Sequence, residues 1–583
     1  MAIIFRHLLL LSVLFVSVYA QEEAKADAKV ADAKVAGAKG EVKVDDPAAE
    51  KAREEIEAEW LKKDAYKTFN EEKVLGPHEM FGDPFGNPND FKDKKIPDDF
   101  GGRAPPAYAM PVELGYKGKW EIVSENSGVS SMHAMLLPKT NKLNTDTWSS
   151  SGGLDIEGTL GSTGGFQGGA NTVRYLGTAE GSDWREFPTA LADRRWYSTQ
   201  ATLPDGAFIV VGGRDAFSYE YIPKEGQSNP KPFAFEFLRQ TSDPEENNLY
   251  PFVYLSTDGN VFIFANSRSV LLSPTTNQIV REFPELPGGS RNYPASGASV
   301  LLPIKFHSQD PKEIVPAEVL ICGGSAHKDS YSKAEKQIFY TALEDCGRMR
   351  ITAKDPVWKR ELMPTPRIMG DMMVLATGEV LILNGAKRGA SGWGFAREPN
   401  FAPVLYSPRA KIGARFTELA PSTIPRMYHS TSTVLPDGKI LVAGSNTNNG
   451  YIYDAMYPTE LRVEKYSPPY LDAAVITKRP EIVTINEQMT YAQNIDIEVK
   501  ITGGKVDHGD VRVTMYSPAF TTHGINMNQR LILLPMREVV PAGGNYKVGV
   551  ISPISNLVAP VGYYMLSVVF QGVPSVTKWV QIK

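Results

Sequence analysis

Residues 428–444 read YHSTSTVLPDGKILVAG, and residues 197–212 read YSTQATLPDGAFIVVG. In both segments small and apolar residues alternate ahead of an Asp-Gly pair, and a short apolar run then leads to a glycine. Asp-Gly between two such runs is typical of the tight turn that joins antiparallel strands. Each segment is therefore predicted to be a β-hairpin.

Weaker copies of this hairpin start at residues 148, 250 and 369. The turn glycines stand at positions 158, 206, 259, 378 and 438, so the step of 119 residues from Gly259 to Gly378 is about twice any other. Residues 293–324 fill that step with a copy in which a polar loop at 307–316 replaces the turn. A further hairpin over 128–143 brings the total to about seven, within the usual range for propeller blades. The repeats predict an all-β fold with a seven-bladed kelch-like β-propeller over residues 111–475.

A different pattern follows the Pro-rich stretch YSPPY at residues 466–470. Short alternating strands recur at 482–485, 496–500, 511–514 and 562–568. Evenly spaced strands of this kind are typical of a β-sandwich. Residues 476–583 are therefore predicted to form an immunoglobulin-like domain.

The N-terminal region carries an export signal ahead of a segment with little apolar content. Residues 1–20 place Arg6 before an apolar run and close on Val-Tyr-Ala, which predicts a signal peptide and a secreted, extracellular protein of the apoplast or cell wall. The apolar run is too short to span a bilayer, and no membrane span is expected. Residues 21–110 are predicted to be a low-complexity tail, a charged helix and a linker.

Charge and cysteine content limit the function further. The formal net charge of -5 provides no basic surplus for binding phosphates, so no nucleic-acid partner is expected. The two cysteines, Cys322 and Cys346, could form one disulfide in an oxidising compartment. The alternative is a pair of buried free thiols.

Two tyrosines occupy equivalent places in the two clearest hairpins. Tyr197 and Tyr428 each follow an arginine by two positions, and both are expected to open an inner strand near one mouth of the propeller channel. His429 comes next after Tyr428, and neighbours in a regular strand point to opposite faces. Both side chains can serve one site only if the strand is entered by a bend, which Pro425 favours. Alone, such a pair is more typical of a packed aromatic and a hydrogen-bonded histidine.

His523 lies in a polar stretch, residues 516–530, that is predicted to be a loop of the last domain. Its spacing from the other residues indicates nothing beyond an exposed loop histidine.

Several separate motifs, in a fixed order, carry a family resemblance. They are RWYST at 195–199, ENNLYP at 246–251, RMYHS at 426–430, YSPPYL at 466–471 and TTHG at 521–524. From about residue 112 to the C-terminus the chain resembles the plant glyoxal oxidase family, copper-radical oxidases related to galactose oxidase. Cys322 and Cys346 match cysteines that this family retains.

The resemblance implies one copper ion held by four side chains. His429 and His523 match the imidazole ligands, Tyr197 the equatorial tyrosine that forms a radical, and Tyr428 the axial tyrosine that acts as base. Imidazole and phenolate donors suit Cu(II). The implied reaction oxidises a small aldehyde of the glyoxal or methylglyoxal type, or an alcohol, and reduces O2 to H2O2. Cell-wall polysaccharide is a further expected partner.

The sequence departs from the family at one position of the site. Ser149 stands where relatives carry the cysteine that is cross-linked to the radical tyrosine, so a radical on Tyr197 would form without a thioether. The sulfur makes the phenol easier to oxidise. Two functions follow: an active copper-dependent aldehyde oxidase, or a copper-binding, catalytically weak protein associated with wall carbohydrate. A propeller that serves only as an interaction scaffold is the third alternative.

Overall fold

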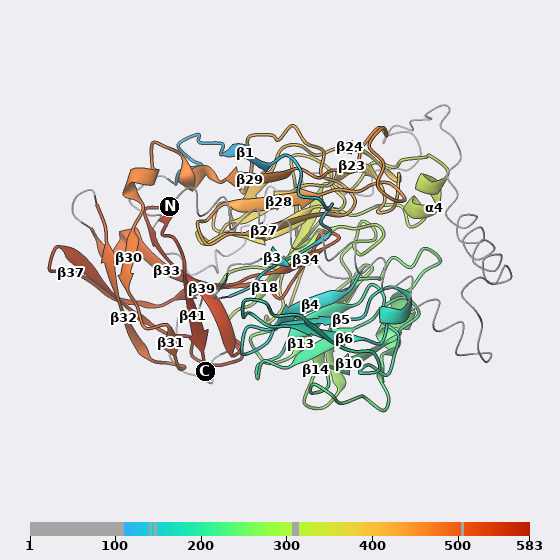
Figure 1. Ribbon diagram of the computed structural model, residues 1–583, viewed down its shortest axis with the longest axis horizontal. Helices are drawn as coiled ribbons and strands as arrows, with labels where there is room; N and C mark the ends of the chain where they lie inside the picture. Colours follow the sequence, from blue (N-terminus) through green and yellow to red (C-terminus); the bar gives the residue numbers. More distant parts are fainter. Residues whose placement is uncertain (1–109, 139, 141–142, 145–148, 306–313, 503–505) are drawn as a thin grey trace. The chain divides into compact units, whose positions relative to one another are not determined.

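The computed structural model describes residues 110–583 except 139, 141–142, 145–148, 306–313 and 503–505 (Figure 1). The predicted signal peptide, tail, charged helix and linker, together with Trp148 and most of the loop at 307–316, lie outside the described residues. Residues 110–126 and 130–583 belong to one compact unit. Among the residues described, no helix is both long and apolar enough to cross a membrane.

The described residues between 119 and 467 include six four-stranded antiparallel sheets, which we call blades. From the inner to the outer strand they are β4–β7 (Ser151–Leu154, Leu160–Thr163, Val173–Leu176, Trp184–Phe187), β8–β11 (Thr199–Thr202, Phe208–Val211, Ser218–Tyr221, Phe233–Ala234), β12–β15 (Phe252–Leu255, Val261–Ala265, Arg268–Ser273, Gln278–Glu282), β16, β18, β19 and β20 (Ala298–Leu301, Glu318–Cys322, Asp345–Arg350, Lys359–Leu362), β21, β22, β25 and β26 (Asp371–Val374, Val380–Leu383, Val404–Tyr406, Phe416–Glu418), and β27, β28, β29 and β1 (Ser430–Val434, Ile440–Gly444, Val463–Ser467, Lys119–Ser124).

The two clearest hairpins form as the sequence predicts. Ser430 pairs with Gly444 at one end of β27 and β28, and Val434 pairs with Ile440 beside the turn. In the other hairpin Thr199 pairs with Val211. The turn glycine Gly438 has φ of 83°, a conformation that glycine adopts without strain.

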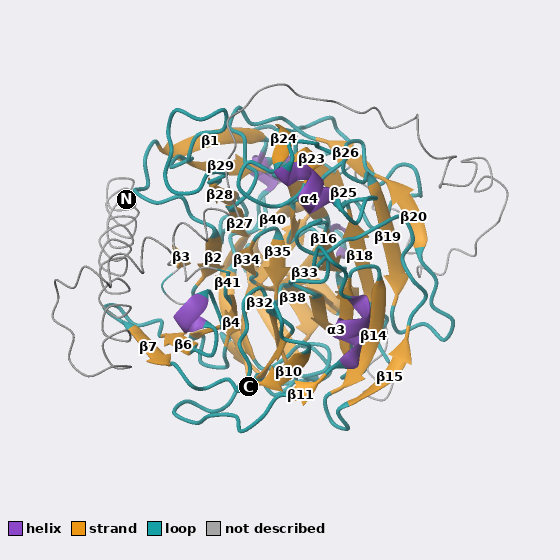
Figure 2. Cartoon of the chain, turned by 90° about the vertical axis from the view of Figure 1, so that its right-hand side faces the viewer, coloured by secondary structure: helices purple, strands orange, loops and turns teal. Residues whose placement is uncertain are grey.

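The inner strands of successive blades lie side by side. β4 contacts β8 and β8 contacts β12; β16 contacts β21, and β21 contacts β27. Figure 2 shows the outer strands β1, β7, β11, β15, β20 and β26 toward the periphery and the inner strands closer to the middle. The inner strands therefore bring residues from distant parts of the sequence together, as the repeat pattern predicts.

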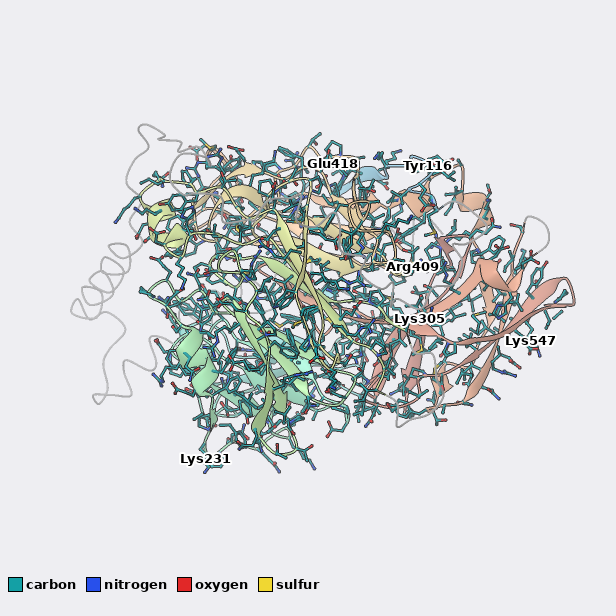
Figure 3. All side chains as sticks on the ribbon, turned by 180° about the vertical axis from the view of Figure 1, so that it is seen from behind. Tyr116, Lys231, Lys305, Arg409, Glu418 and Lys547 are labelled. Carbon is teal, nitrogen blue, oxygen red and sulfur yellow. A yellow bond between two sulfur atoms is a disulfide. The ribbon has the colours of Figure 1, made fainter. Side chains whose placement is uncertain are left out.

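A buried arginine at the entry to three blades fixes the backbone there. Each arginine donates hydrogen bonds to a glycine carbonyl at or just after the end of the second strand and to a carboxylate on the third strand: Arg195 to Gly212 and Glu220, Arg291 to Gly323 and Asp345, Arg426 to Gly444 and Glu464. The guanidinium and carboxylate groups are buried, and a buried charge is tolerated when it is paired. In contrast, charged side chains such as Lys231 and Glu418 project from the outer surface (Figure 3).

A sheet of different origin lies next to β27. Strands β2 (His133–Leu136) and β3 (Leu143–Asn144) pair with each other, and β2 also pairs with β34 (Phe520–Thr522), which turns back into β35 (Ile525–Met527). The stretch predicted to be a loop is thus a β-hairpin at its centre, and that expectation was wrong. The polar sequence of this stretch does not reveal that its backbone is buried. Pairing with β2 gives the buried backbone N–H and C=O groups their hydrogen-bond partners. β35 also contacts β16, β21, β4 and β8, so the hairpin runs among the inner strands (Figure 2).

The C-terminal residues form two further sheets. One contains β17 (Ile304–Lys305), β36 (Arg530–Leu534), β33 (Val511–Ser517), β39 (Gly562–Phe570), β41 (Lys578–Ile582), β31 (Gln488–Met489) and β40 (Val573–Pro574); the other contains β30 (Glu481–Thr484), β32 (Asn494–Lys500), β38 (Asn545–Ile551) and β37 (Met536–Ala542). In β32, Ile495, Ile497 and Val499 are buried while the residues between them are more exposed, which is the alternation of a strand with one face on a core.

The remaining elements are short. They are the hairpin of β23 (Ala386–Gly389) and β24 (Ala396–Pro399), the helices α3 (Glu236–Thr241) and α4 (Ser330–Glu335), and the 3-10 helices η2 (Gln167–Gly169), η3 (Pro469–Leu471), η4 (Ile476–Lys478) and η5 (His508–Asp510). Cys322 and Cys346 face each other on β18 and β19 and form a disulfide.

Candidate metal centre

A residue in the left-handed backbone conformation stands at the entry to the inner strand of each of the six blades. Tyr197 has φ of 66° and is followed two positions later by β8. Ser149, Tyr250 and Met369 have φ values of 59°, 46° and 57° at the corresponding entries of other blades. Tyr197 therefore precedes its strand, whereas the sequence predicts that it opens the strand. Such strained residues cluster at functional sites.

Tyr428 and His429 both precede β27, which begins at Ser430. His429 has φ of 62°, and its ring stacks on that of Tyr428 with centroids 3.8 Å apart. The chain thus bends at this point, so neither side chain follows the alternation of a strand. Tyr428 and His429 can serve one site only if the chain bends before the strand, and this bend is present at His429.

His523 occupies the turn of the hairpin β34–β35, with φ of 50°. Its side chain is buried, and Nδ1 lies 2.6 Å from the Thr522 hydroxyl while Nε2 has no hydrogen-bond partner. The backbone of Gly524 packs so closely that a Cβ there would lie 3.0 Å from the Gly370 carbonyl oxygen. The turn is held against β21, and it directs an unpartnered imidazole nitrogen inward.

The four side chains named from the sequence come together in the structure. The centroid of the His523 ring lies 4.9 Å from that of His429, 5.7 Å from Tyr428 and 5.9 Å from Tyr197. Three of them enter from two blades and the fourth enters from the C-terminal hairpin. Residues separated by more than 300 positions thus share one buried cluster.

Three further residues of the cluster, Tyr293, Tyr250 and His133, are not among the site residues that the sequence indicates. The centroid of the Tyr250 ring lies 5.4 Å from that of His523. Tyr293 places its hydroxyl 2.9 Å from that of Tyr428 and 3.4 Å from that of Tyr197. A signal for it exists, because Tyr293 follows Arg291 by two positions, as Tyr197 follows Arg195. His133 is fully buried on β2, 6.3 Å from the His523 ring, and its Nε2 is unpartnered. No sequence pattern singles out His133.

Burial sets the protonation of these groups. Desolvation lowers the pKa of His429 to about 3 and holds the pKa of His523 well below its usual value, so both imidazoles are neutral and can offer a lone pair to a metal. Desolvation also raises the pKa of Tyr197, although hydrogen bonding with Tyr293 and Ser149 opposes the rise. The pKa of Tyr428 is well above its usual value because the phenol is buried beside Tyr197.

The donor set fits one copper ion. In the described part of the chain no group of three or more His, Cys, Asp or Glu side chains could hold a metal, so a site here needs the phenol oxygens as well as the imidazoles. Two imidazoles and two phenols with an unpartnered nitrogen are donors that Cu(II) accepts. His429, His523, Tyr197 and Tyr428 are the residues that could bind it.

Ser149 lies directly beside Tyr197. Its carbonyl oxygen accepts a hydrogen bond of 3.3 Å from the Tyr197 backbone N–H, and its hydroxyl interacts with the Tyr197 phenol. A hydroxyl at this point can make a hydrogen bond with the phenol, but it provides no sulfur for a covalent link.

A fungal alcohol oxidase of the AA5 family, solved in complex with copper, has the same fold with a TM-score of 0.64 over 80% of this chain and 99% of that one, at 18% identity. Residues 479–582 match the galactose oxidase-like early set domain. The protein therefore has an all-β, galactose oxidase-like fold. Residues 131–470 match the glyoxal oxidase N-terminus.

Named plant relatives agree with this match. Aldehyde oxidase GLOX1 of Arabidopsis thaliana is 53% identical over 81% of this chain and 86% of its own length, and aldehyde oxidase GLOX of Vitis pseudoreticulata is 37% identical over 80% and 97%. The putative aldehyde oxidase Art an 7 of Artemisia annua is 40% identical over 82% and 90%. The chain belongs to the glyoxal oxidase family.

Proposed function

We propose that this protein is a secreted copper-dependent oxidase of the apoplast or cell wall. It converts the hydrate of a small aldehyde, of the glyoxal or methylglyoxal type, to a carboxylic acid while O2 is reduced to H2O2. The substrate loses two electrons and two protons, and O2 gains them. The observation that supports the proposal best is the convergence of Tyr197, Tyr428, His429 and His523 on one buried point, with His523 Nε2 left unpartnered.

Each of the four side chains has a separate task in this proposal. His429 and His523 hold copper, and the neighbouring Thr522 hydroxyl fixes the orientation of the His523 ring. Copper held by these residues would supply a one-electron acceptor, and a radical on Tyr197 would supply the second. Once it has released its own proton on binding copper, Tyr428 would take the proton from the substrate hydroxyl at its phenolate oxygen. Burial of the cluster excludes bulk water, which strengthens the interactions of its polar groups.

The finer architecture is part of the same proposal. Residues 111–475 form a seven-bladed propeller in which β2 and β3 belong to the seventh blade beside β27, and the six four-stranded blades support this count. Residues 476–583 form an immunoglobulin-like sandwich, and the pair of C-terminal sheets supports it. The signal peptide at residues 1–20 supports secretion.

Ser149 favours one alternative function. Without the cross-linking sulfur, the protein would bind copper but oxidise substrates weakly, and it would associate with wall polysaccharide. The buried Ser149 hydroxyl beside the Tyr197 phenol is the specific observation in favour of this alternative.

Peroxide release from the purified, copper-loaded protein separates the two functions. The assay uses methylglyoxal, glyoxal and galactose as substrates, and compares the natural protein with Tyr197→Phe and a matched control, Tyr254→Phe. Tyr254 is also buried, but its hydroxyl pairs with Ser299 outside the cluster. Peroxide that disappears only in Tyr197→Phe supports the oxidase. Stoichiometric copper without peroxide favours the alternative, and no copper binding at all refutes both.

A further inference from the structure

Arg214 is a cation that the backbone holds beside the cluster. It follows β9 through Gly212 and Gly213, whose φ values of 74° and 124° turn the chain back toward the entry of β8. The Arg214 backbone N–H donates a hydrogen bond of 2.6 Å to the Trp196 carbonyl oxygen, and its Cζ lies 5.5 Å from the centroid of the Trp196 ring. Since Trp196 directly precedes Tyr197, Arg214 is a neighbour of the site.

The Arg214 side chain has hydrogen-bond donors to offer a ligand. Its Nε lies 2.8 Å from a carboxylate oxygen of Glu246, and the side chain is 47% exposed. In the part of the chain that the structure describes, no protein group accepts a hydrogen bond from its two Nη nitrogens. Two nitrogens on one planar fork can bind both oxygens of a carboxylate.

The charge of Arg214 reaches the cluster but is locally balanced. Burial raises the pKa of Tyr197, and the Arg214 guanidinium is one of the groups that oppose this rise. Burial, together with the nearby carboxylates of Asp215 and Asp243, raises the pKa of Glu246. Because these carboxylates offset the guanidinium at longer range, binding of an anion here depends on direct contact with the Nη nitrogens.

We propose that Arg214 determines the substrate class of the site: its Nη nitrogens bind a carboxylate on the carbon next to the aldehyde, and so favour an aldehyde acid over a neutral aldehyde of the same size. The aldehyde hydrate loses two electrons and two protons, which O2 gains, while the carboxylate stays unchanged on Arg214. This inference rests on the proposed copper-oxidase function.

Glyoxylate and methylglyoxal are a matched pair of substrates, because they have equal numbers of non-hydrogen atoms and differ in charge. Peroxide release from copper-loaded protein gives kcat/KM for each. In Arg214→Gln the ratio of kcat/KM for glyoxylate to that for methylglyoxal should fall about tenfold, mainly through the KM for glyoxylate, because charge-assisted hydrogen bonds are lost. Glu246→Gln removes a competing carboxylate and should raise the same ratio, which damage to the fold would not do.

Arg185→Gln is the matched control. Arg185 is 49% exposed, its Nε lies 2.7 Å from Glu225, and its Cζ lies 6.0 Å from the centroid of the Tyr175 ring, but it stands on the outer strand β7. This variant should keep the ratio of the natural protein. Pyruvate binding to the metal-free protein gives a measurement that needs no turnover. Saturation-transfer NMR of the pyruvate methyl group should show a dissociation constant about tenfold higher in Arg214→Gln and unchanged in Arg185→Gln.

The two measurements separate this inference from the proposed function. An unchanged ratio in Arg214→Gln, or equal pyruvate binding by Arg214→Gln and the natural protein, would overturn the role of Arg214 even where peroxide release confirms the oxidase. Absence of pyruvate binding by the natural protein would overturn it as well. If the natural protein oxidises no aldehyde, the proposed function fails, whereas weaker pyruvate binding in Arg214→Gln alone would still support a carboxylate site.

Discussion

Asp371 joins the two segments that carry the histidines. This carboxylate on β21 is buried, and it accepts hydrogen bonds from Ser432 Oγ at 2.8 Å, Asn384 Nδ2 at 2.9 Å and Asn526 Nδ2 at 3.5 Å. Ser432 is three residues after His429, and Asn526 is three residues after His523. Replacement by asparagine keeps the shape of the side chain and removes its charge.

The expected effect is a change in how stability depends on pH. Burial raises the pKa of Asp371 from 3.8 to about 7 in the folded protein. Between about pH 4 and 7 the carboxyl is ionised in the unfolded chain but still protonated in the folded protein. The free energy of unfolding therefore falls as pH rises through this range, and this contribution is constant above about pH 7. A tenfold difference in acidity between the folded and unfolded states is worth about 1.4 kcal/mol, which gives about 4 kcal/mol in total for this carboxyl.

Urea unfolding of the metal-free protein, with a chelator present, measures this quantity between about pH 4 and 8. The free energy of unfolding of the natural protein minus that of Asp371→Asn should fall by about 4 kcal/mol over about pH 4 to 7, since other titrating groups cancel in the difference. A difference that stays flat, or that rises with pH, would show that the carboxylate is already ionised in the folded state at low pH, and the argument would be wrong.

Three further predictions concern the metal centre and the blades. Burial raises the pKa of Tyr197 and Tyr428, so each phenol is protonated in the metal-free protein and must release a proton to ligate copper. The copper affinity should therefore rise about tenfold per pH unit for each such phenol. Isothermal titration between about pH 6 and 8 measures this affinity, and a value that does not change with pH would contradict the prediction. Thr522→Val should weaken copper binding about tenfold in the same titration, because His523 Nδ1 loses its partner, while Thr502→Val on the surface should not. Replacing Cys322 and Cys346 together by alanine opens a link across 24 residues and should lower the free energy of unfolding by about 3 kcal/mol; an unchanged urea midpoint would refute it.

The sequence predicts the blades well because local chemistry decides them. An Asp-Gly turn between alternating apolar residues fixes both the strand pairing and the register, and the hairpins over 197–212 and 428–444 have the pairing expected. The degenerate copy at 293–324 follows from its spacing, and β16 pairs with β18 there. The C-terminal strands follow from alternation in the same way.

The site is less predictable because it depends on contacts that no local pattern encodes. His523 resembles an exposed loop residue until β34 pairs with β2, which is almost 400 positions away in the sequence. Tyr293 is hard to single out because its hairpin lacks the Asp-Gly turn that marks the others, although the pattern Arg-x-Tyr repeats at 195–197, 291–293 and 426–428. His133 lies on a strand that no repeat identifies.

The arrangement explains how chemistry can vary on one backbone. The left-handed entries at Ser149, Tyr197, Tyr250 and Met369 all precede inner strands of blades, and they differ in side chain while sharing a backbone conformation. The conformation is supported by the blades themselves, through hydrogen bonds such as that from the Tyr250 N–H to the Tyr197 carbonyl. A substitution at an entry therefore changes what faces the cluster without changing the fold. The hairpin that follows Ser149 keeps its pairing, so the proposed absence of a thioether would change the redox properties of the Tyr197 phenol and not the fold.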